Sequence, residues 1–343
     1  MIAGLLLPLP SLAGELWDTT AYKKYDQKLI VSYYQSFRRF DFDLVAKSPA
    51  LLNKGRMLYR ADAAVVSGID LTWDKLSLSL DLNTTPVDSA SLRRLGKTNY
   101  FNLFFGFGSN RMLMEFSVRS FEGFYERNTA QYTPGFDPKT DAFYQDPNLI
   151  NRVFRARMLY FFNATRFSYR AAYSCNYRQL KSAASLLLTG NVYHAHFHSN
   201  KGIIPPLLRQ QNPFGDRYRG STVIGYNAGL GFAFNLVILK GWFFNGTFWL
   251  GPDLHLSQLH LEERGNLDPE LTFFGETRLA TGFNLKNFYF TLSSKSDILS
   301  VSDRYYYITN SFVSAQVALG FRIPVRSGKA VRRIQNNRIY KML

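Results

Sequence analysis

The amino-acid sequence predicts an all-β protein, namely a transmembrane antiparallel up-and-down β-barrel of about 12 strands. Three observations support this fold class. Segments of about ten residues alternate between apolar and polar positions, as strands with two different faces do. Aromatic residues are abundant, with 30 Phe and 21 Tyr among 343 residues. No apolar run reaches the roughly 18 residues that a membrane-spanning helix needs.

The N-terminal part of the chain precedes the regular alternation. Residues 1–14 form a short apolar run ending in Ala-Gly, which predicts the remnant of a secretion signal peptide. No basic segment comes before this run, so a buried N-terminal segment is the alternative. Residues 15–58 are interpreted as an N-terminal arm or plug. Partial alternation between Lys28 and Phe37 also allows an extra strand there.

The predicted barrel covers residues 59–325. Its clearest strand has Leu at positions 76, 78, 80 and 82, alternating with Ser77, Ser79 and Asp81, so one face is apolar and the other polar. Trp73-Asp74-Lys75 is the expected tight turn before it. An even number of strands closes the barrel without an edge. The expected strands are residues 59–72, 75–84, 97–108, 111–122, 151–163, 166–175, 182–198, 220–238, 241–257, 270–284, 287–298 and 312–324.

Three further segments lack alternation. Residues 123–150 and 199–219 are expected to be long connections that fold inward or cover an opening of the barrel. Residues 326–343 carry six basic side chains and no acidic one, and they are interpreted as a solvated basic C-terminal tail.

Composition favours a membrane barrel over a soluble β-protein with its apolar faces turned inward. A soluble barrel needs a polar outer face rich in Lys and Glu. The polar face here consists largely of Ser, Thr, Asn, Gly and spaced Arg, as expected for a wet interior. The net charge of +16 is scattered rather than gathered into one patch, which argues against nucleic-acid binding. The single Cys175 excludes an internal disulfide.

Several charged residues fall on the predicted inner face. The candidates for lumen charges are Arg119, Arg155, Arg157 and Arg170, with Glu115 as a counter-charge. A ring of basic side chains biases a pore toward anions. The alternative is an Arg–Glu network that fills and stiffens the lumen, because each interior charge needs a partner. The sequence leaves both interpretations open.

Histidines supply the other candidate chemistry. His194, His196 and His198 occupy alternate positions on one strand face, and two of them with a group from another strand form a candidate zinc or copper site. The alternative is a polar rim at a strand end. The same parity includes apolar residues upstream, so the strand either bulges or leaves the membrane before His194. With Ser199 and Asn200 these histidines also suggest a lipid esterase, although neighbouring residues on a strand point to opposite faces. No cofactor is indicated.

Short motifs distributed over most of the chain resemble one known family. They are Lys28-Leu-Ile-Val-Ser-Tyr-Tyr, Gly96-Lys-Thr-Asn-Tyr100 leading to Gly123-Phe-Tyr125, Asn163-Ala-Thr-Arg-Phe-Ser-Tyr169, Gln179-Leu-Lys-Ser182, Ile204-Pro205 and Gly225-Tyr226. The chain thereby resembles the uncharacterised outer-membrane barrel family of Bacteroidota called domain of unknown function four-four-two-one. The family has no assigned activity, so the resemblance implies fold and location only. Two departures from its pattern are Tyr59-Arg60-Ala61-Asp62 and the basic tail after Phe321.

These observations lead to three functional hypotheses for a protein of the bacterial outer membrane. The first is a porin-like narrow pore or small-solute transporter with a basic polar lumen. The second is a closed barrel that acts as a membrane anchor or assembly partner for another envelope protein. The third is an outer-membrane lipid esterase. The expected partners are membrane lipids, with lipopolysaccharide and an envelope protein as candidates, and no nucleic acid.

Overall fold

The computed structural model describes residues 17–25, 27–47, 56–83, 88–210, 217–239, 241–260, 268–302 and 306–325, together with Gln335, Asn337 and Tyr340. The expected signal peptide and the basic side chains of the expected tail lie outside these residues. Within the described ranges, no helix combines the length and the apolarity needed to cross a membrane.

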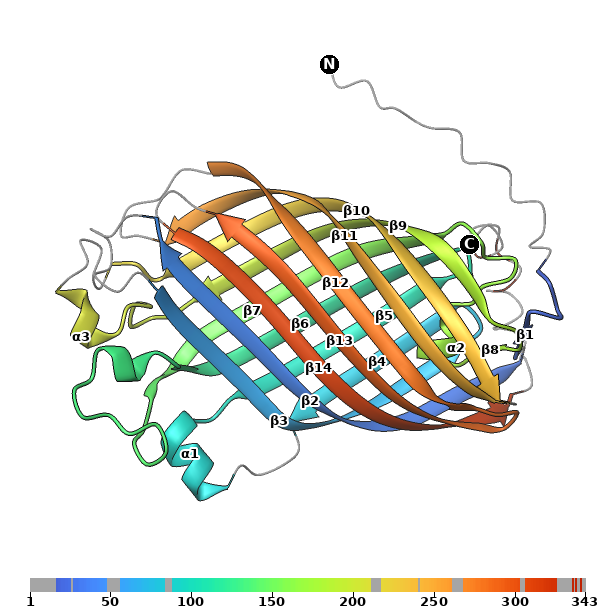
Figure 1. The fold of residues 1–343 in the computed structure, drawn as a ribbon, viewed down its shortest axis with the longest axis horizontal. Coiled ribbons are helices and arrows are strands. Elements are labelled where there is room, and N and C mark those ends of the chain that lie inside the picture. The colour runs from blue at the N-terminus through green and yellow to red at the C-terminus, as the bar shows by residue number, and fades with distance from the viewer. Residues whose placement is uncertain are drawn as a thin grey trace, which may run out of the picture.

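Twelve antiparallel strands form one closed barrel (Figure 1). Each strand pairs with its neighbours along the chain, and β14 pairs with β2 to close the ring. The strands are β2 (Lys28–Ala46), β3 (Arg56–Trp73), β4 (Leu76–Asn83), β5 (Asn99–Gly108), β6 (Met112–Glu126), β7 (Tyr144–Phe161), β9 (Ala183–His198), β10 (Gly220–Leu239), β11 (Trp242–His260), β12 (Asp268–Asn284), β13 (Phe288–Ser302) and β14 (Tyr306–Pro324).

The number of strands was predicted correctly, but two errors compensate each other. One barrel strand was not included in the predicted barrel, and one predicted strand is absent from it. The barrel begins at Lys28 with β2 rather than at residue 59, so the extra strand that the sequence allowed within residues 15–58 is present and belongs to the barrel wall. The expected strand 166–175 is wrong. Those residues belong to the connection between β7 and β9, which contains α2 (Arg170–Tyr173) and β8 (Tyr177–Gln179). We call this connection, residues 162–182, the plug segment.

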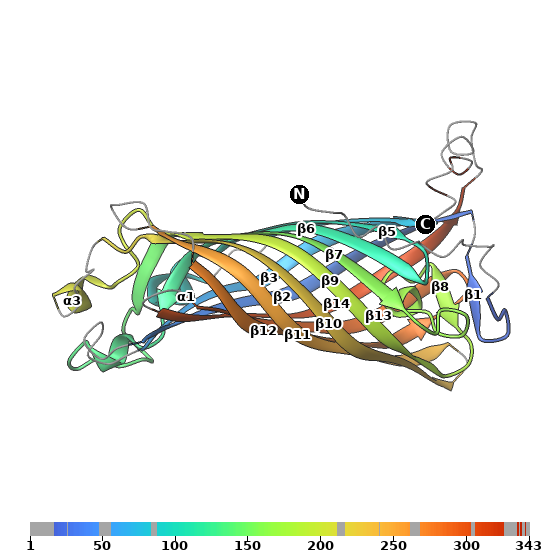
Figure 2. The ribbon, with the colours of Figure 1, turned by 90° about the horizontal axis from the view of Figure 1, so that it is seen from above.

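The two ends of the barrel differ (Figures 1 and 2). We call the end with the N-terminal arm and the plug segment the terminal end. There β1 (Tyr22–Lys24) pairs with β8 in a small antiparallel sheet. We call the opposite end the loop end. It carries the long connections with α1 (Ser89–Leu95), the 3-10 helix η2 (Thr129–Gln131) and α3 (Pro206–Arg209). Outer-membrane barrels have short periplasmic turns and long external loops, so we infer that the terminal end faces the periplasm.

Along the middle of the barrel, apolar side chains point outward and polar ones inward, as predicted. Leu230 and Leu250 are each 69% exposed on the outer face, whereas Asn235 and Asn245 are buried inside. The leucines of β4 point outward and its Asp81 is buried. A contiguous apolar exterior of this extent needs lipid around it. The chain is therefore a transmembrane barrel of the outer-membrane type.

The pattern inverts toward the loop end. On the outer face of the β2–β3 hairpin, Arg39 contacts Asp62 at 2.8 Å and Arg60 contacts Asp41 at 2.5 Å. The inner face of the same stretch carries the buried Phe40 and Phe42. A strand needs only about ten residues to cross the hydrocarbon core, and β2 has 19. On the side of β2 and β3 the barrel thus continues beyond the membrane, and there it is built like a soluble protein.

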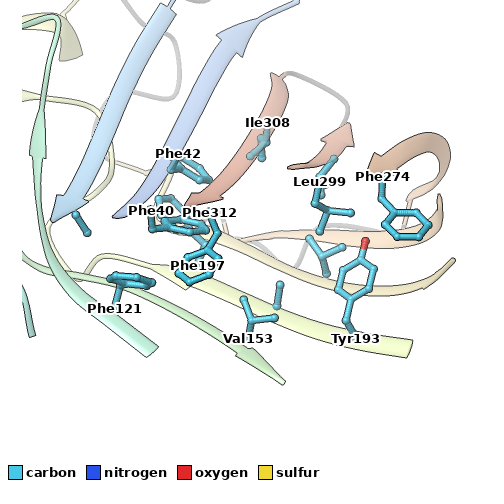
Figure 3. Close-up of a cluster of buried hydrophobic side chains, with 14 of the residues drawn as sticks. Phe40, Phe42, Phe121, Val153, Tyr193, Phe197, Phe274, Leu299, Ile308 and Phe312 are labelled. Carbon is cyan, nitrogen blue, oxygen red and sulfur yellow. The ribbon is translucent and has the colours of Figure 1, made fainter. Parts of the chain in front are cut away.

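The protruding part of the barrel is filled by apolar side chains (Figure 3). The rings of Phe42 and Phe197 stack with centroids 3.5 Å apart, and Phe40 stacks on Phe121 at 5.5 Å. The connection between β9 and β10 folds inward and places the fully buried Ile203 against this cluster. We call this packed cluster the apolar seal.

Candidate functional site: a charged chamber between two seals

A chamber of about 250 Å³ lies inside the barrel. Its wall includes Phe312 from the apolar seal and Tyr169 and Tyr173 from the plug segment, so it lies between the two. Among the described residues, seven basic side chains and three acidic ones, Asp70, Asp81 and Glu115, line it. The basic ones are Arg38, Arg119, Arg155, Arg157, Arg170, Arg278 and Lys295.

The strongest contacts form around one buried carboxylate, that of Glu276 on β12. Arg157 donates to both of its oxygens at 2.9 and 2.5 Å, and Arg278 donates to Oε1 at 2.6 Å. Arg278 also forms a two-pronged pair with Glu115, at 2.9 Å for each contact. Paired guanidinium–carboxylate contacts of this kind are short and directional. This part of the lumen is therefore an Arg–Glu network.

Three other basic groups are held more loosely. Arg119 and Arg155 approach Oδ2 of Asp297 at 3.5 and 3.6 Å, and Lys295 lies 3.9 Å from the same oxygen. Arg155 and Lys295 also reach Glu276 at 3.5 and 3.3 Å. These distances exceed those of good charge-assisted hydrogen bonds. The three cations share the carboxylates of Asp297 and Glu276, which are too few to give each cation a partner of its own.

A second polar cluster surrounds Asp81 on β4. Tyr34 donates to one carboxylate oxygen, and Arg38 donates to the other at 3.1 Å. Asn102 lies 3.3 Å from the second oxygen. Burial of this carboxylate is possible because several donors replace water around it. The cluster fixes the wall of the chamber on the side of β2 to β5.

Polar contacts hold the plug segment in the terminal end. Arg170 donates to the main-chain oxygens of Asp74, at 2.9 Å, and of Gly108. Arg322 on β14 donates to the carbonyl oxygen of Cys175 at 3.1 and 2.6 Å. Burial raises the pKa of the Cys175 thiol to about 12. Tyr22 in the N-terminal arm donates to the carbonyl oxygen of Ala164 at 2.7 Å and so covers the plug from outside.

The structure brings together most of the expected lumen charges. Glu115, Arg119, Arg155 and Arg157 line the chamber from β6 and β7. Arg170 also lines it, but from α2 in the plug segment rather than from a strand. Their main counterparts were not predicted from the sequence; they are Glu276, Arg278, Lys295 and Asp297. Glu276 and Arg278 share one parity on β12, and Lys295 and Asp297 share one parity on β13, so charges at alternate positions of each strand were the available signal.

The three candidate histidines lie elsewhere, on the outer face at the loop end, together with His260. The rings of His196, His198 and His260 have centroids 5.3–5.7 Å apart, and no such ring contact involves His194 among the described residues. No register shift occurs along β9, so the strand leaves the membrane before the histidines instead of bulging. Within the described residues, no three His, Cys, Asp or Glu side chains are arranged to hold a metal ion.

The esterase arrangement is not assembled in this region. The hydroxyl group of Ser199 is buried and donates to Asp146 at 2.5 Å. His198 points to the outer face and contacts Asn200 at 3.0 Å. A histidine that activates a serine must lie within hydrogen-bond reach of its hydroxyl group, and these two side chains are on opposite faces of the barrel wall.

One family matches almost the whole chain. The family described as "Domain of unknown function (DUF4421)" matches residues 17–323. No curated protein matches the chain.

Solved outer-membrane barrels are similar to this chain in fold. The protease OmpT from Escherichia coli is 7% identical, with a TM-score of 0.38, over 88% of this chain and 98% of that chain. The NanC porin is 8% identical, with a TM-score of 0.33, over 85% and 98%. The β-domain of the Bordetella autotransporter BrkA is 12% identical, with a TM-score of 0.31, over 84% and 99%. Likenesses this distant carry no information about the activity of this chain.

Proposed function

The chain belongs to the family described as "Domain of unknown function (DUF4421)", and from this premise we propose that it is a closed outer-membrane barrel that does not conduct in its resting state. On this proposal it serves as a membrane anchor or assembly partner for another envelope protein. The terminal end is the working face, by which we mean the surface that binds this partner.

The apolar seal is the observation that carries this proposal. It consists of side chains from the barrel wall itself, among them Phe42 of β2, Phe121 of β6 and Phe312 of β14, which are at most 3% exposed. Opening it would separate close-packed aromatic rings and expose them to water, which is costly. A gate that opens readily is usually a thin constriction or a mobile loop. The seal therefore supports a permanent closure.

The terminal end has properties suited to a docking face. Only Asp18 and Asp74 are acidic among the described residues of its turns, N-terminal arm and plug segment. The basic side chains there include Lys23, Lys24, Lys28, Lys75, Arg166, Arg178, Lys181 and Lys286. Charge complementarity steers association, so the expected partner presents an acidic surface on the periplasmic side.

A small-solute transporter is the second candidate function. The basic chamber favours it, because basic walls attract anionic solutes. On this alternative the closed barrel is an occluded state, and the apolar seal and the plug segment open in turn.

Conductance in a planar lipid bilayer separates the two candidates. We expect silence from folded, heat-modifiable protein at applied potentials at which a porin purified in the same detergent conducts. Discrete current steps with anion preference would overturn the closed-barrel proposal. In that case Arg155→Glu with Arg157→Glu, which reverses the charge of two chamber residues, should change the ion preference.

Site-specific photo-crosslinking in cells tests the docking face. A photoreactive residue at Lys23 or Lys181, both exposed at the terminal end, should form a crosslink with a defined protein, and one at Lys97 or Lys139 of the loop end should not. Charge reversal at Arg178 should weaken the terminal-end crosslink. Equal crosslinking from both ends would contradict a working face at the terminal end.

A further inference from the structure

We propose that the chamber is a binding site for one small oxyanion, held by Arg119, Arg155 and Lys295. This inference goes beyond the proposed function and does not depend on it, because a closed barrel and a transporter can both bind an anion inside.

Negative charge is in short supply around Arg119, Arg155 and Lys295. Asp297 and Glu276 are the carboxylates that the three cations contact, and neither of them lines the chamber. Glu276 is already engaged by Arg157 and Arg278 at 2.5–2.9 Å. The three cations therefore contact carboxylates outside the chamber while they line the chamber themselves, with the guanidinium group of Arg119 lying 3.8 Å from the centroid of the Phe312 ring.

The three cations also have hydrogen-bond donors that the described residues do not fully satisfy. The Nε atom of Arg119 is buried and has no hydrogen-bond partner among the described residues. The side chain of Arg155 is 14% exposed and that of Lys295 is 30% exposed, toward the interior. Buried donors normally have partners, and a buried charge without a good one is costly. A ligand that supplies acceptors would relieve this cost.

The side-chain nitrogen atoms of the three cations lie close enough together to contact one ligand. The three nitrogen atoms all lie within 3.5–3.9 Å of Oδ2 of Asp297, so no two of them are more than about 7.5 Å apart. A single tetrahedral anion with acceptors on all sides can bridge them. The hydroxyl groups of Ser117, Ser293 and Ser294 line the same chamber and can add donors. Guanidinium groups prefer ligands with two oxygens at fork spacing, which points to phosphate, sulfate or a carboxylate rather than chloride.

The test compares anions during refolding, so that entry into a closed barrel is not limiting. Protein refolded from urea into detergent in phosphate, sulfate, acetate or chloride at equal ionic strength is heated, and loss of the fast-migrating folded form on a gel gives the melting temperature. We expect the oxyanion that binds to raise it by roughly 5 °C or more over chloride at a 100-fold excess over its dissociation constant. The phosphate and sulfate arms against the acetate arm identify the class of oxyanion.

Matched variants locate the effect. Arg155→Gln and Lys295→Gln should each lose the oxyanion-dependent shift. Arg39→Gln removes an arginine from the outer face, where it pairs with Asp62 at 2.8 Å, and should keep the shift. Two lumen variants are used so that one remains if the other does not fold. Equal melting temperatures in all anions, or a shift that persists in both folded lumen variants, would overturn the proposal.

Discussion

A single buried carboxylate, that of Glu276, organises the charges in the lumen. Arg157, Arg278 and Lys295 all contact it, at 2.5–3.3 Å, and its side chain has no exposed surface. Removing one partner of a buried ion pair leaves the others uncompensated, which costs about 3–5 kcal/mol. We therefore expect Glu276→Gln to lower the free energy of unfolding by about that amount, measured by urea titration in lipid vesicles with tryptophan fluorescence.

An exposed ion pair provides the control. Asp62 pairs with Arg39 on the outer face of the protruding hairpin, with side chains 20% and 38% exposed. Such pairs contribute about 0–1 kcal/mol, so Arg39→Gln, which leaves Asp62 its hydrogen bond from Tyr125, should change the unfolding midpoint little. Equal losses in the two variants would show that the lumen network is not what stabilises the barrel.

Cys175 reports on the plug segment, because it is the single thiol in the chain and is fully buried. Burial raises the pKa of its thiol to about 12, so both the accessible fraction and the thiolate fraction are small near neutral pH. We expect no maleimide labelling of the folded protein at pH 8, by intact mass. Arg322→Ala removes the donor to the Cys175 carbonyl and should speed labelling. Rapid labelling of the unaltered folded protein would mean that the plug segment opens freely.

Tyrosine rings lying flat over glycines join neighbouring strands on the inner wall. Tyr193 of β9 is directly opposite Gly225 of β10, and a Cβ atom at residue 225 would overlap the ring. The hydroxyl group of Tyr193 donates to Asp253 at 2.8 Å, so the ring has a second constraint. We expect Gly225→Ala to displace the ring and to destabilise the barrel by about 1–3 kcal/mol, as overpacking does.

Gly190 is the matched control on the neighbouring strand. A Cβ atom there meets nothing within 4 Å. Gly190→Ala should therefore change the urea midpoint little, and any small rise would come from the reduced entropy of the unfolded chain. A similar loss in both variants would show that glycine acts through backbone flexibility and not through the tyrosine contact.

The strand β2 shows which elements the sequence could predict. Its apolar residues change parity along the strand, from Tyr33 and Phe37 facing outward to Phe40 and Phe42 facing inward. A search for apolar residues at one constant parity ends at this change, although the strand continues in the same sheet. Strands that remain mostly within the membrane, such as β4, keep one parity and were predicted within a residue or two of their bounds.

In the plug segment the opposite error occurred, because residues 166–175 were predicted to be a barrel strand and are not. Its residues resemble a strand in composition, with Phe167, Tyr169 and Ala171 at alternate positions. What folds them inward is a set of long-range contacts, such as that of Asn284 with the carbonyl oxygen of Ala171 at 2.8 Å. Local pattern contains no information about such contacts. For the same reason the sequence suggested the basic half of the charge network but not which carboxylates complete it.

At the scale of the whole molecule, one barrel contains two environments in sequence. The membrane part is apolar outside and polar inside, whereas the protruding β2–β3 hairpin is charged outside and apolar inside. The transition requires the inverted parity of β2 and places Phe40 and Phe42 of the apolar seal behind a charged outer face. Closure is thus a property of the protruding fold, while the plug segment is a separate closure at the other end.

Two closures in series have a consequence for conductance, because current requires both to be open. A variant in which a two-residue turn replaces residues 165–182 removes all but the first three residues of the plug segment, and we expect it to show no current in a planar bilayer. Phe42→Ser with Phe197→Ser disrupts the ring stack of the apolar seal and should also be silent alone. The combination should conduct, with the folded state of each variant checked by heat modifiability. Current through the plug-deleted variant alone would show that the seal does not exclude ions, and the working barrier would then be the plug.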